Sequence, residues 1–381
     1  MNRTRDRFPN PRIIWSAAMR IPVLFAVFLL SPLTLGQIAP EVLTVETLPE
    51  PGPNWFLGKT WSGGAHIFDA HSGEMMGMVS LAKNAPTLIA NPDKREIYAA
   101  ESYMTRETRG TRTDIVAIYD YDNLRTVAEI EVPNHIARLP VKRHLGLLNN
   151  GRHLAVLNMN PGHSVSIVDV EDRIFVDEIS TPSCAVIMPV AENDFLQVCG
   201  DGTLQLIQLD LSGFQQNRER STVFFNVIDD PVFDRVARSA DGWILPTHGG
   251  MIYEVSTDDD EILIGEGWSL IAEGEESWRP GGDEFISAHQ ELGLLYVAMH
   301  EGGVDTHHQY GDEIWLYDLE TRQRLHRHAL EVPVRSLMVT QESNPKLIVS
   351  DEAGGTQVFD AVSFKHERSI ETPASVHFED F

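Results

Sequence analysis

The stretch IVAIYD at residues 115–120 decides the fold, because its pattern returns along the chain. Each copy is a short run of β-branched and aromatic residues that ends at an Asp, and a polar turn and a second apolar run follow it. Clear copies are AHIFD at 65–69, VSIVD at 165–169, LQLIQLD at 204–210, IWLYD at 314–318 and QVFD at 357–360. A degenerate copy, MIYEVS at 251–256, brings the number to about seven. The pattern predicts a series of strand pairs.

The spacing of the copies, about 41 to 62 residues, is the period of four-stranded propeller blades. Helical repeats would show an apolar rhythm of about 3.6 residues, which these segments lack. We therefore expect an all-β protein, a seven-bladed β-propeller over residues 62–381, with some 45 residues in each blade. The segment 37–61 holds four prolines and is expected to form a coil-like N-terminal arm.

The first 36 residues have the pattern of an export signal. Five arginines precede or flank the start of the apolar run 21–30, and the small residues Thr34 and Gly36 follow it. The run is short for a membrane span and contains Pro22. We expect a signal peptide over 1–36 that is cleaved after Gly36, so that the protein reaches the periplasm. A retained anchor, or a start at Met19, is the alternative.

Export makes the two cysteines informative, because disulfides persist in oxidising compartments. Cys184 and Cys199 flank two apolar runs joined by the turn-like residues 191–194, so a hairpin would bring them opposite each other. The sequence predicts a disulfide between them. Two buried free thiols are the alternative.

Composition and motifs argue against several other functions. The 381 residues carry a formal charge of -26, which repels nucleic acid. There is no Gly-x-Ser-x-Gly elbow for a serine nucleophile, and the Gly-Gly pairs at 281–282 and 302–303 do not fit a phosphate-binding loop. His307 and His308 are expected to point to opposite sides of an extended backbone, in a polar loop rather than a metal site. The acidic run 258–261 is expected to be a solvated turn.

Two further segments are candidates for function. Residues 103–114 form a long, basic and amphipathic connection that interrupts a predicted blade. In the segment 278–282, Trp278 and Arg279 precede a Pro-Gly-Gly turn and could anchor a partner. Simple packing of this loop on the next blade is an equal alternative.

These segments also carry a resemblance to a known family. The motifs that carry it are RGTRTD at 109–114, Cys184 with CGDG at 199–202, DDPVF at 229–233, WRPGG at 278–282 and the stretch from Met299-His300 to DEIWLYD at 312–318. On these motifs, the chain resembles the heavy chains of methylamine and aromatic amine dehydrogenases from about Leu43 to its last repeat.

The resemblance implies a seven-bladed propeller without a cofactor of its own. Its partner would be a small, disulfide-rich light subunit carrying tryptophan tryptophylquinone, in an assembly of two heavy and two light subunits. Such enzymes deaminate primary amines oxidatively and pass electrons to a blue copper protein of the amicyanin or azurin type. A periplasmic propeller that only scaffolds partners is the alternative function.

The resemblance also implies roles for individual residues. Tyr103 and Met104 would line the substrate channel, and Arg106, Arg109, Trp278 and Arg279 would contact the partner. Met104 stands where methylamine enzymes carry Phe, so the size of the amine is open. The stretches 199–202 and 306–318 resemble the aromatic amine type more closely.

Overall fold

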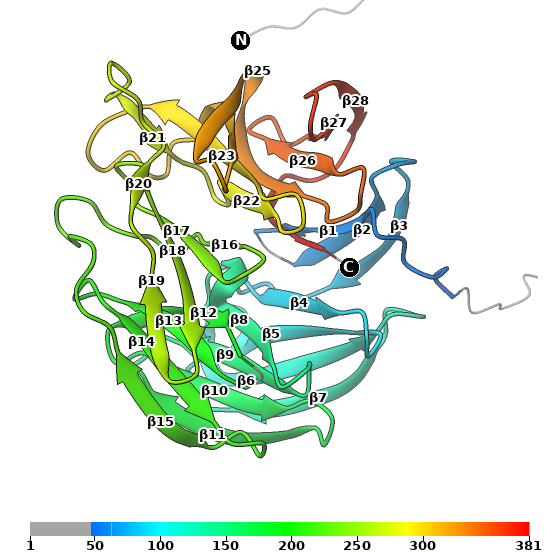
Figure 1. Ribbon diagram of the computed structural model, residues 1–381. Coiled ribbons are helices and arrows are strands. Elements are labelled where there is room, and N and C mark those ends of the chain that lie inside the picture. Colours follow the sequence, from blue (N-terminus) through cyan, green and yellow to red (C-terminus); the bar gives the residue numbers. More distant parts are fainter. Residues whose placement is uncertain (1–46, 62, 134, 192, 381) are drawn as a thin grey trace, which may run out of the picture. The chain divides into compact units, whose positions relative to one another are not determined.

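Strands make up nearly all the regular structure of the computed structural model, which describes residues 47–380 except 62, 134 and 192 (Figure 1). The repeat phrases fall on strands as predicted: residues 115–120 end β6 (Arg109–Asp120), and 65–69 end β2 (Gly64–Asp69). The proposed signal peptide lies outside the described residues. The first strand, β1 (Trp55–Thr60), falls inside the predicted arm 37–61, so the sheets begin earlier than residue 62.

Four sheets have four antiparallel strands each. The first joins β29 (Ser375–Asp380), β1, β2 and β3 (Met75–Ser80). The second contains β4 (Thr87–Asn91), β5 (Glu96–Arg106), β6 and β7 (Thr126–Val132). The third contains β8 (Leu145–Leu148), β9 (His153–Asn158), β10 (Ser164–Asp169) and β11 (Ile174–Ser180). The fourth contains β12 (Cys184–Pro189), β13 (Phe195–Cys199), β14 (Leu204–Leu209) and β15 (Gln215–Arg220).

Two sheets are larger. A five-stranded sheet contains β16 (Ala237–Arg238), β17 (Trp243–Pro246), β18 (Met251–Asp258), β19 (Glu261–Ile264) and β20 (Trp268–Ser269). An eight-stranded sheet contains β21 (Trp278–Pro280), β22 (Ile286–His289), β23 (Leu294–Glu301), β24 (Gly311–Asp318), β25 (Gln323–Val339), β26 (Lys346–Asp351), β27 (Thr356–Asp360) and β28 (His366–Ile370).

An all-β propeller is confirmed, but the prediction of seven four-stranded blades is wrong. The described residues form five separate blades of four or five strands, and a single eight-stranded sheet accounts for the rest. The cause lies in β25, which runs for 17 residues and pairs with β24 in its first part and with β26 from Val334 onward. Its sequence contains no glycine, and its one proline, Pro333, lies directly before the change of partner without ending the strand.

The repeated Asp explains why so many strands end alike. Asp69 Oδ1 accepts hydrogen bonds from the backbone N–H groups of His71 and Ser72. Asp120, Asp169, Asp210, Asp318 and Asp360 accept from backbone N–H groups two to four residues later in the same way. These local turns reverse the chain after each strand, which is the physical basis of the sequence repeat.

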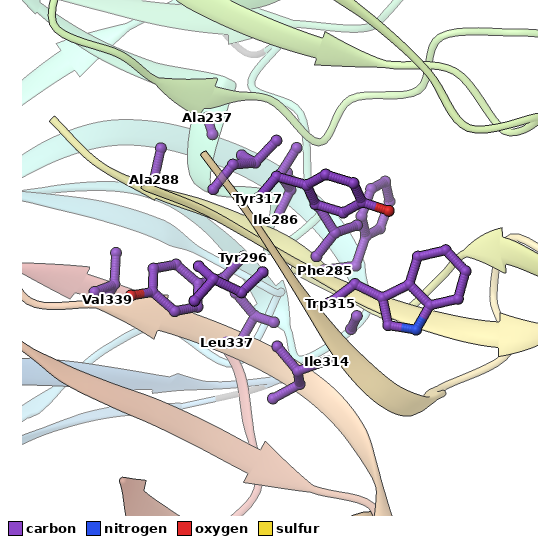
Figure 2. Close-up of a cluster of buried hydrophobic side chains, with 14 of the residues drawn as sticks. Ala237, Phe285, Ile286, Ala288, Tyr296, Ile314, Trp315, Tyr317, Leu337 and Val339 are labelled. Carbon is purple, nitrogen blue, oxygen red and sulfur yellow. The ribbon is translucent and has the colours of Figure 1, made fainter. Parts of the chain in front are cut away.

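The sheets close into a ring around their innermost strands. β29, from the end of the chain, pairs with β1, so the two ends of the described propeller share one sheet. Contacts between neighbouring strands of this inner ring involve β4, β8, β22, β25 and β29. Two further strands are joined by a hydrogen bond, since Arg238 of β16 donates to the Pro189 carbonyl oxygen of β12. The apolar cores lie between adjacent sheets. Figure 2 shows one of them, in which Ala237 of β16 belongs to the same cluster as Tyr296, Trp315 and Tyr317.

The predicted disulfide is present. Cys184 and Cys199 lie directly opposite each other in the β12–β13 register, with Cα atoms 4.0 Å apart, and both residues are buried. Within the described residues, no helix has the length and apolar character needed to span a membrane.

Candidate functional site

The hairpin of β5 and β6 extends beyond its own sheet. In the described registers, β4 pairs with β5 as far as Ala100, and β7 pairs with β6 as far as Asp114. Beyond these points β5 and β6 pair only with each other, up to Arg106 opposite Arg109. We call residues 101–113 the ribbon. The predicted long connection is therefore mostly strand, with a two-residue turn in which Glu107 adopts a φ of 56°.

Tyr103 and Met104 lie next to each other on the ribbon, so their side chains point to opposite faces. The Tyr103 hydroxyl donates to Glu101 Oε2 at 2.5 Å, on the same face of β5, and the residue is still 45% exposed. Glu101 is buried and also accepts from the Tyr119 hydroxyl at 3.1 Å. Burial raises the pKa of Glu101 above its ordinary value. The carboxyl group thus fixes the position of the Tyr103 ring.

An ion pair anchors the base of the ribbon. Arg112 donates to both carboxylate oxygens of Asp114, at 2.7 and 2.6 Å, and to the Ile136 carbonyl oxygen at 2.7 Å. Asp114 is fully buried and accepts in turn from the Ile136 N–H at 2.8 Å. These bonds tie the ribbon to the segment between β7 and β8. Arg106 and Arg109 are exposed at the ribbon tip.

A cavity of about 380 Å³ opens at the same end of the propeller, since the segment between β7 and β8 also lines it. Its aromatic lining comes from four other connections: Trp61 follows β1, Phe233 precedes β16, Phe285 precedes β22, and His307 and His308 lie between β23 and β24. The ring of Phe233 stacks on His307 with centroids 4.2 Å apart. We call this end of the propeller the ribbon face.

The two adjacent histidines do not point apart as predicted. Their ring centroids are 4.0 Å apart, because residues 307 and 308 lie in a turn rather than in an extended segment. His248 Nε2 lies 3.0 Å from the Gly303 carbonyl oxygen and holds this loop in place. In the part of the chain that the structure describes, no group of three His, Cys, Asp or Glu side chains could hold a metal ion.

Trp278 and Arg279 occupy a different environment. Trp278 packs on Trp315 with ring centroids 5.3 Å apart, and the Arg327 guanidinium lies over both rings at 4.8 and 4.6 Å. Arg279 donates to the backbone oxygens of Glu276 and Trp278. We call Trp278, Trp315, Arg324, Arg327 and their carboxylates Glu275 and Glu313 the tryptophan cluster. Trp278 and Arg279 are thus held within the eight-stranded sheet, apart from Tyr103 and Met104, and their predicted contact with a partner stays a prediction.

Sequence reasoning missed Trp61, Phe233 and Glu101. Trp61 was assigned to the arm, although a Trp followed by Ser-Gly-Gly and a strand is typical of an aromatic side chain at a turn. The sequence around Glu101 did not indicate a role in the site, because this residue is buried beneath Tyr103 only in the folded chain. The geometry of the ribbon face suits binding: it offers exposed aromatic and apolar side chains around a shallow cavity.

The comparisons with known proteins agree with this picture. The family model for the methylamine dehydrogenase heavy chain matches residues 55–375. The methylamine dehydrogenase heavy chain of Methylobacillus flagellatus is 26% identical over 80% of this chain and 78% of its own, and that of Methylophilus methylotrophus is 26% identical over 80% and 76%. The solved structure of the dihydro-heme d1 dehydrogenase NirN is 17% identical, covers 89% of this chain and 77% of its own, and superposes with a TM-score of 0.58, which supports the fold alone. The resemblance found in the motifs is confirmed, and the chain belongs to the methylamine dehydrogenase heavy chain family.

Proposed function

We propose that this chain is the heavy subunit of a periplasmic amine dehydrogenase and that it binds its light subunit on the ribbon face. The observation that carries the proposal is the exposure of large apolar side chains on this face. Trp61 is 55% exposed, and Ile228 and Val304, on the connections next to Phe233 and His307, are each 83% exposed. Exposed apolar side chains that gather around a cavity are typical of a surface that another protein covers.

The light subunit would carry tryptophan tryptophylquinone, which supplies the electrophilic carbonyl and two-electron sink that amine oxidation needs. The ordinary side chains of this chain cannot supply either, so its contribution is to orient the amine and exclude water. Tyr103, held by Glu101, and Met104 would line the channel between the subunits. Arg106, Arg109, Trp278 and Arg279 are proposed as partner contacts.

The remaining features of the proposed function follow the family. The substrate would be a primary amine, and the electron acceptor a blue copper protein of the amicyanin or azurin type. The assembly would contain two heavy and two light subunits. Cleavage after Gly36 would release the mature protein, starting at Gln37, into the periplasm, and the intact mass of the exported protein tests this step.

The test begins with the coding sequence next to this gene, where the proposal expects a small cysteine-rich exported protein, and continues with co-expression of the two chains. The pair should co-purify, absorb as a quinone and oxidise amines, whereas this chain alone should do neither. Trp61→Glu should weaken the complex at least tenfold, because it places a charge in a desolvated contact. Met75→Glu is the matched control, since Met75 is 60% exposed on the outer strand β3. Equal loss with both variants would contradict the assigned face, and a chain that only scaffolds proteins would co-purify without amine oxidation.

A further inference from the structure

A second cavity, also about 380 Å³ in volume, lies inside the ring of innermost strands. It shares no lining residue with the cavity of the ribbon face. Pro92, Val190, Gln290 and Gln341 line it where an innermost strand turns into the next strand of its sheet. These turns lie at the opposite end of the sheets from the β5–β6 turn, because successive strands are antiparallel. The central cavity therefore opens away from the ribbon face.

Two arginines line this cavity around one indole ring. The guanidinium of Arg143 lies 4.7 Å from the centroid of Trp243, and that of Arg238 lies 5.2 Å from it. Trp243 is itself buried, and its Nε1 donates to the Pro189 carbonyl oxygen at 2.8 Å. Arg238 donates to the same carbonyl oxygen at 2.6 Å. The indole thus contacts both cations at the cavity wall, and the shared acceptor fixes Arg238.

Neither guanidinium has an acidic partner. Among the described residues, no Asp or Glu oxygen lies within 4.0 Å of Arg143 or Arg238. Three acidic residues also line the cavity. Glu379 and Asp380 lie near Lys142, whose Nζ is 3.4 Å from Glu379 Oε2 and 3.8 Å from Asp380 Oδ1. Buried Glu284 lies farther than 4.0 Å from both guanidinium groups, although its charge interacts with that of Arg143. Among the described residues, these two neighbouring guanidinium groups therefore have no carboxylate in direct contact, although they lie at the wall of a cavity.

Holding these cations together is unfavourable without an anion. Burial, followed by the nearby charge of Arg143, lowers the pKa of Arg238. Partly desolvated like charges repel, and an oxyanion between them would replace repulsion by charge-assisted hydrogen bonds. The planar guanidinium fork suits carboxylate and phosphate oxygens, and stacking on Trp243 fixes its orientation in advance.

We propose that the central cavity is a binding site for a small oxyanion, a carboxylate or a phosphate, which Arg143 and Arg238 hold beside Trp243. A volume of about 380 Å³ admits a molecule of a few carbon atoms together with water. Bound there, the anion would link β16 to the segment before β8, and so to other inner strands of the ring. The site does not depend on the proposed amine dehydrogenase function, because it opens at the other end of the propeller.

The test is a titration of the purified full chain with inorganic phosphate and, in a separate arm, with succinate. Sodium chloride keeps the ionic strength constant, and calorimetry and tryptophan fluorescence report binding. We expect saturable binding of at least one probe with one site per chain. Arg143→Gln and Arg238→Gln should each raise the Kd roughly tenfold, as expected when a charge-assisted hydrogen bond is lost. Trp243→Phe should retain the heat signal and lose most of the fluorescence change.

Arg322→Gln is the control, since Arg322 carries the same charge outside the cavity. Arg238→Lys serves if Arg238→Gln does not fold, and should bind with an intermediate Kd because it keeps the charge but not the fork. Saturation by phosphate alone or succinate alone supports the site and identifies the class of its ligand. Failure of both probes to saturate, or a Kd unchanged in both arginine variants, overturns the proposal.

Discussion

The ribbon and the tryptophan cluster use the same residue types for different purposes. Both combine arginines with aromatic side chains, and the sequence suggested a single partner interface for them. In the tryptophan cluster, Glu275 Oε1 accepts from Arg327 at 2.8 Å, and Glu313 Oε2 accepts from both Arg327 and the Trp315 indole. At the ribbon tip, Arg106 and Arg109 are exposed.

The difference lies in whether the cations are already neutralised. The carboxylates of the tryptophan cluster form a network that holds the loop before β21 against the eight-stranded sheet. The paired arginines Arg324 and Arg327 contribute to stability and offer little charge to a partner. Exposed arginines at the tip of a projecting ribbon contribute little to stability and remain available for an acidic surface. An arginine beside an aromatic residue therefore indicates an interface only where its charge is unpaired.

Removal of Arg327 should have the largest effect. Arg327→Ala leaves Glu275 and Glu313 without this cation and removes the group stacked on Trp278 and Trp315. We expect the free energy of unfolding to fall by about 3 kcal/mol in urea denaturation. Arg109→Ala, the matched change at the ribbon tip, should leave the midpoint unchanged. Equal losses in the two variants would remove the distinction between the regions.

Acid should act with opposite sign on Glu101 of the ribbon and on His300 of β23, the strand that pairs with β21 and its Trp278. Burial raises the pKa of Glu101 above 4.5, so the folded chain binds this proton more readily than the unfolded chain. Lowering the pH therefore removes the free-energy cost of the buried carboxylate charge and stabilises the fold. Burial lowers the pKa of His300 to about 4, below its ordinary 6.5. The unfolded chain then binds that proton first, so stability should fall between pH 6.5 and 4, by about 2 kcal/mol for this residue.

Urea denaturation at several pH values from 7 to 4.5 separates these effects. His300→Gln should flatten the loss of stability below pH 6.5, and Glu101→Gln should steepen it. Buried His144 and His377 act in the same direction as His300, so the comparison is between each variant and the parent protein. If the curves of the parent and both variants run parallel, the environments assigned to Glu101 and His300 are wrong.

Charge reversal at the ribbon tip should have a smaller effect, and on binding alone. Arg106→Glu combined with Arg109→Glu should weaken association with the light subunit roughly tenfold at low salt, mainly by slowing association. Added salt should reduce the difference, because exposed charges are screened. Stability should stay that of the parent. If the double variant leaves the association rate and its salt dependence unchanged, the ribbon has no role in docking.

The success and failure of the sequence predictions have one physical origin. The Asp-ending phrases predicted strands correctly, because Asp69 and its counterparts act on backbone groups within four residues. The number of separate blades was wrong, because β25 continues from its pairing with β24 into its pairing with β26, although Pro333 lies at the change of partner. The disulfide was predictable because two apolar runs and a turn fix the register of β12 and β13.

The candidate site was predictable only in part. The ribbon drew attention through its charge and length, but its turn at 107–108 lacks the Asn-Gly or Asp-Gly pair that would have revealed a hairpin. One cavity brings together Phe233, Trp61 and the two histidines, which come from three connections far apart in the chain. They meet only because the sheets of the propeller close into a ring. Sequence spacing does not show that these side chains share one cavity, nor that Trp278 and the ribbon belong to different sheets.

The smallest predicted effect concerns Met104 and distinguishes the two faces of the ribbon. In the assembled enzyme, Met104→Ala should shift the preference among amines of different size by about 1 kcal/mol, roughly fivefold in relative kcat/KM, because a single side chain in an apolar pocket tunes fit by that amount. Met75→Ala on β3 is the control for loss of an exposed methionine. Tyr103→Phe keeps the ring on the other face of the ribbon and removes only the hydroxyl that donates to Glu101, so it should change the stability of the ribbon more than the preference. If Tyr103→Phe alters the preference and Met104→Ala does not, Tyr103 rather than Met104 sets the fit of the amine.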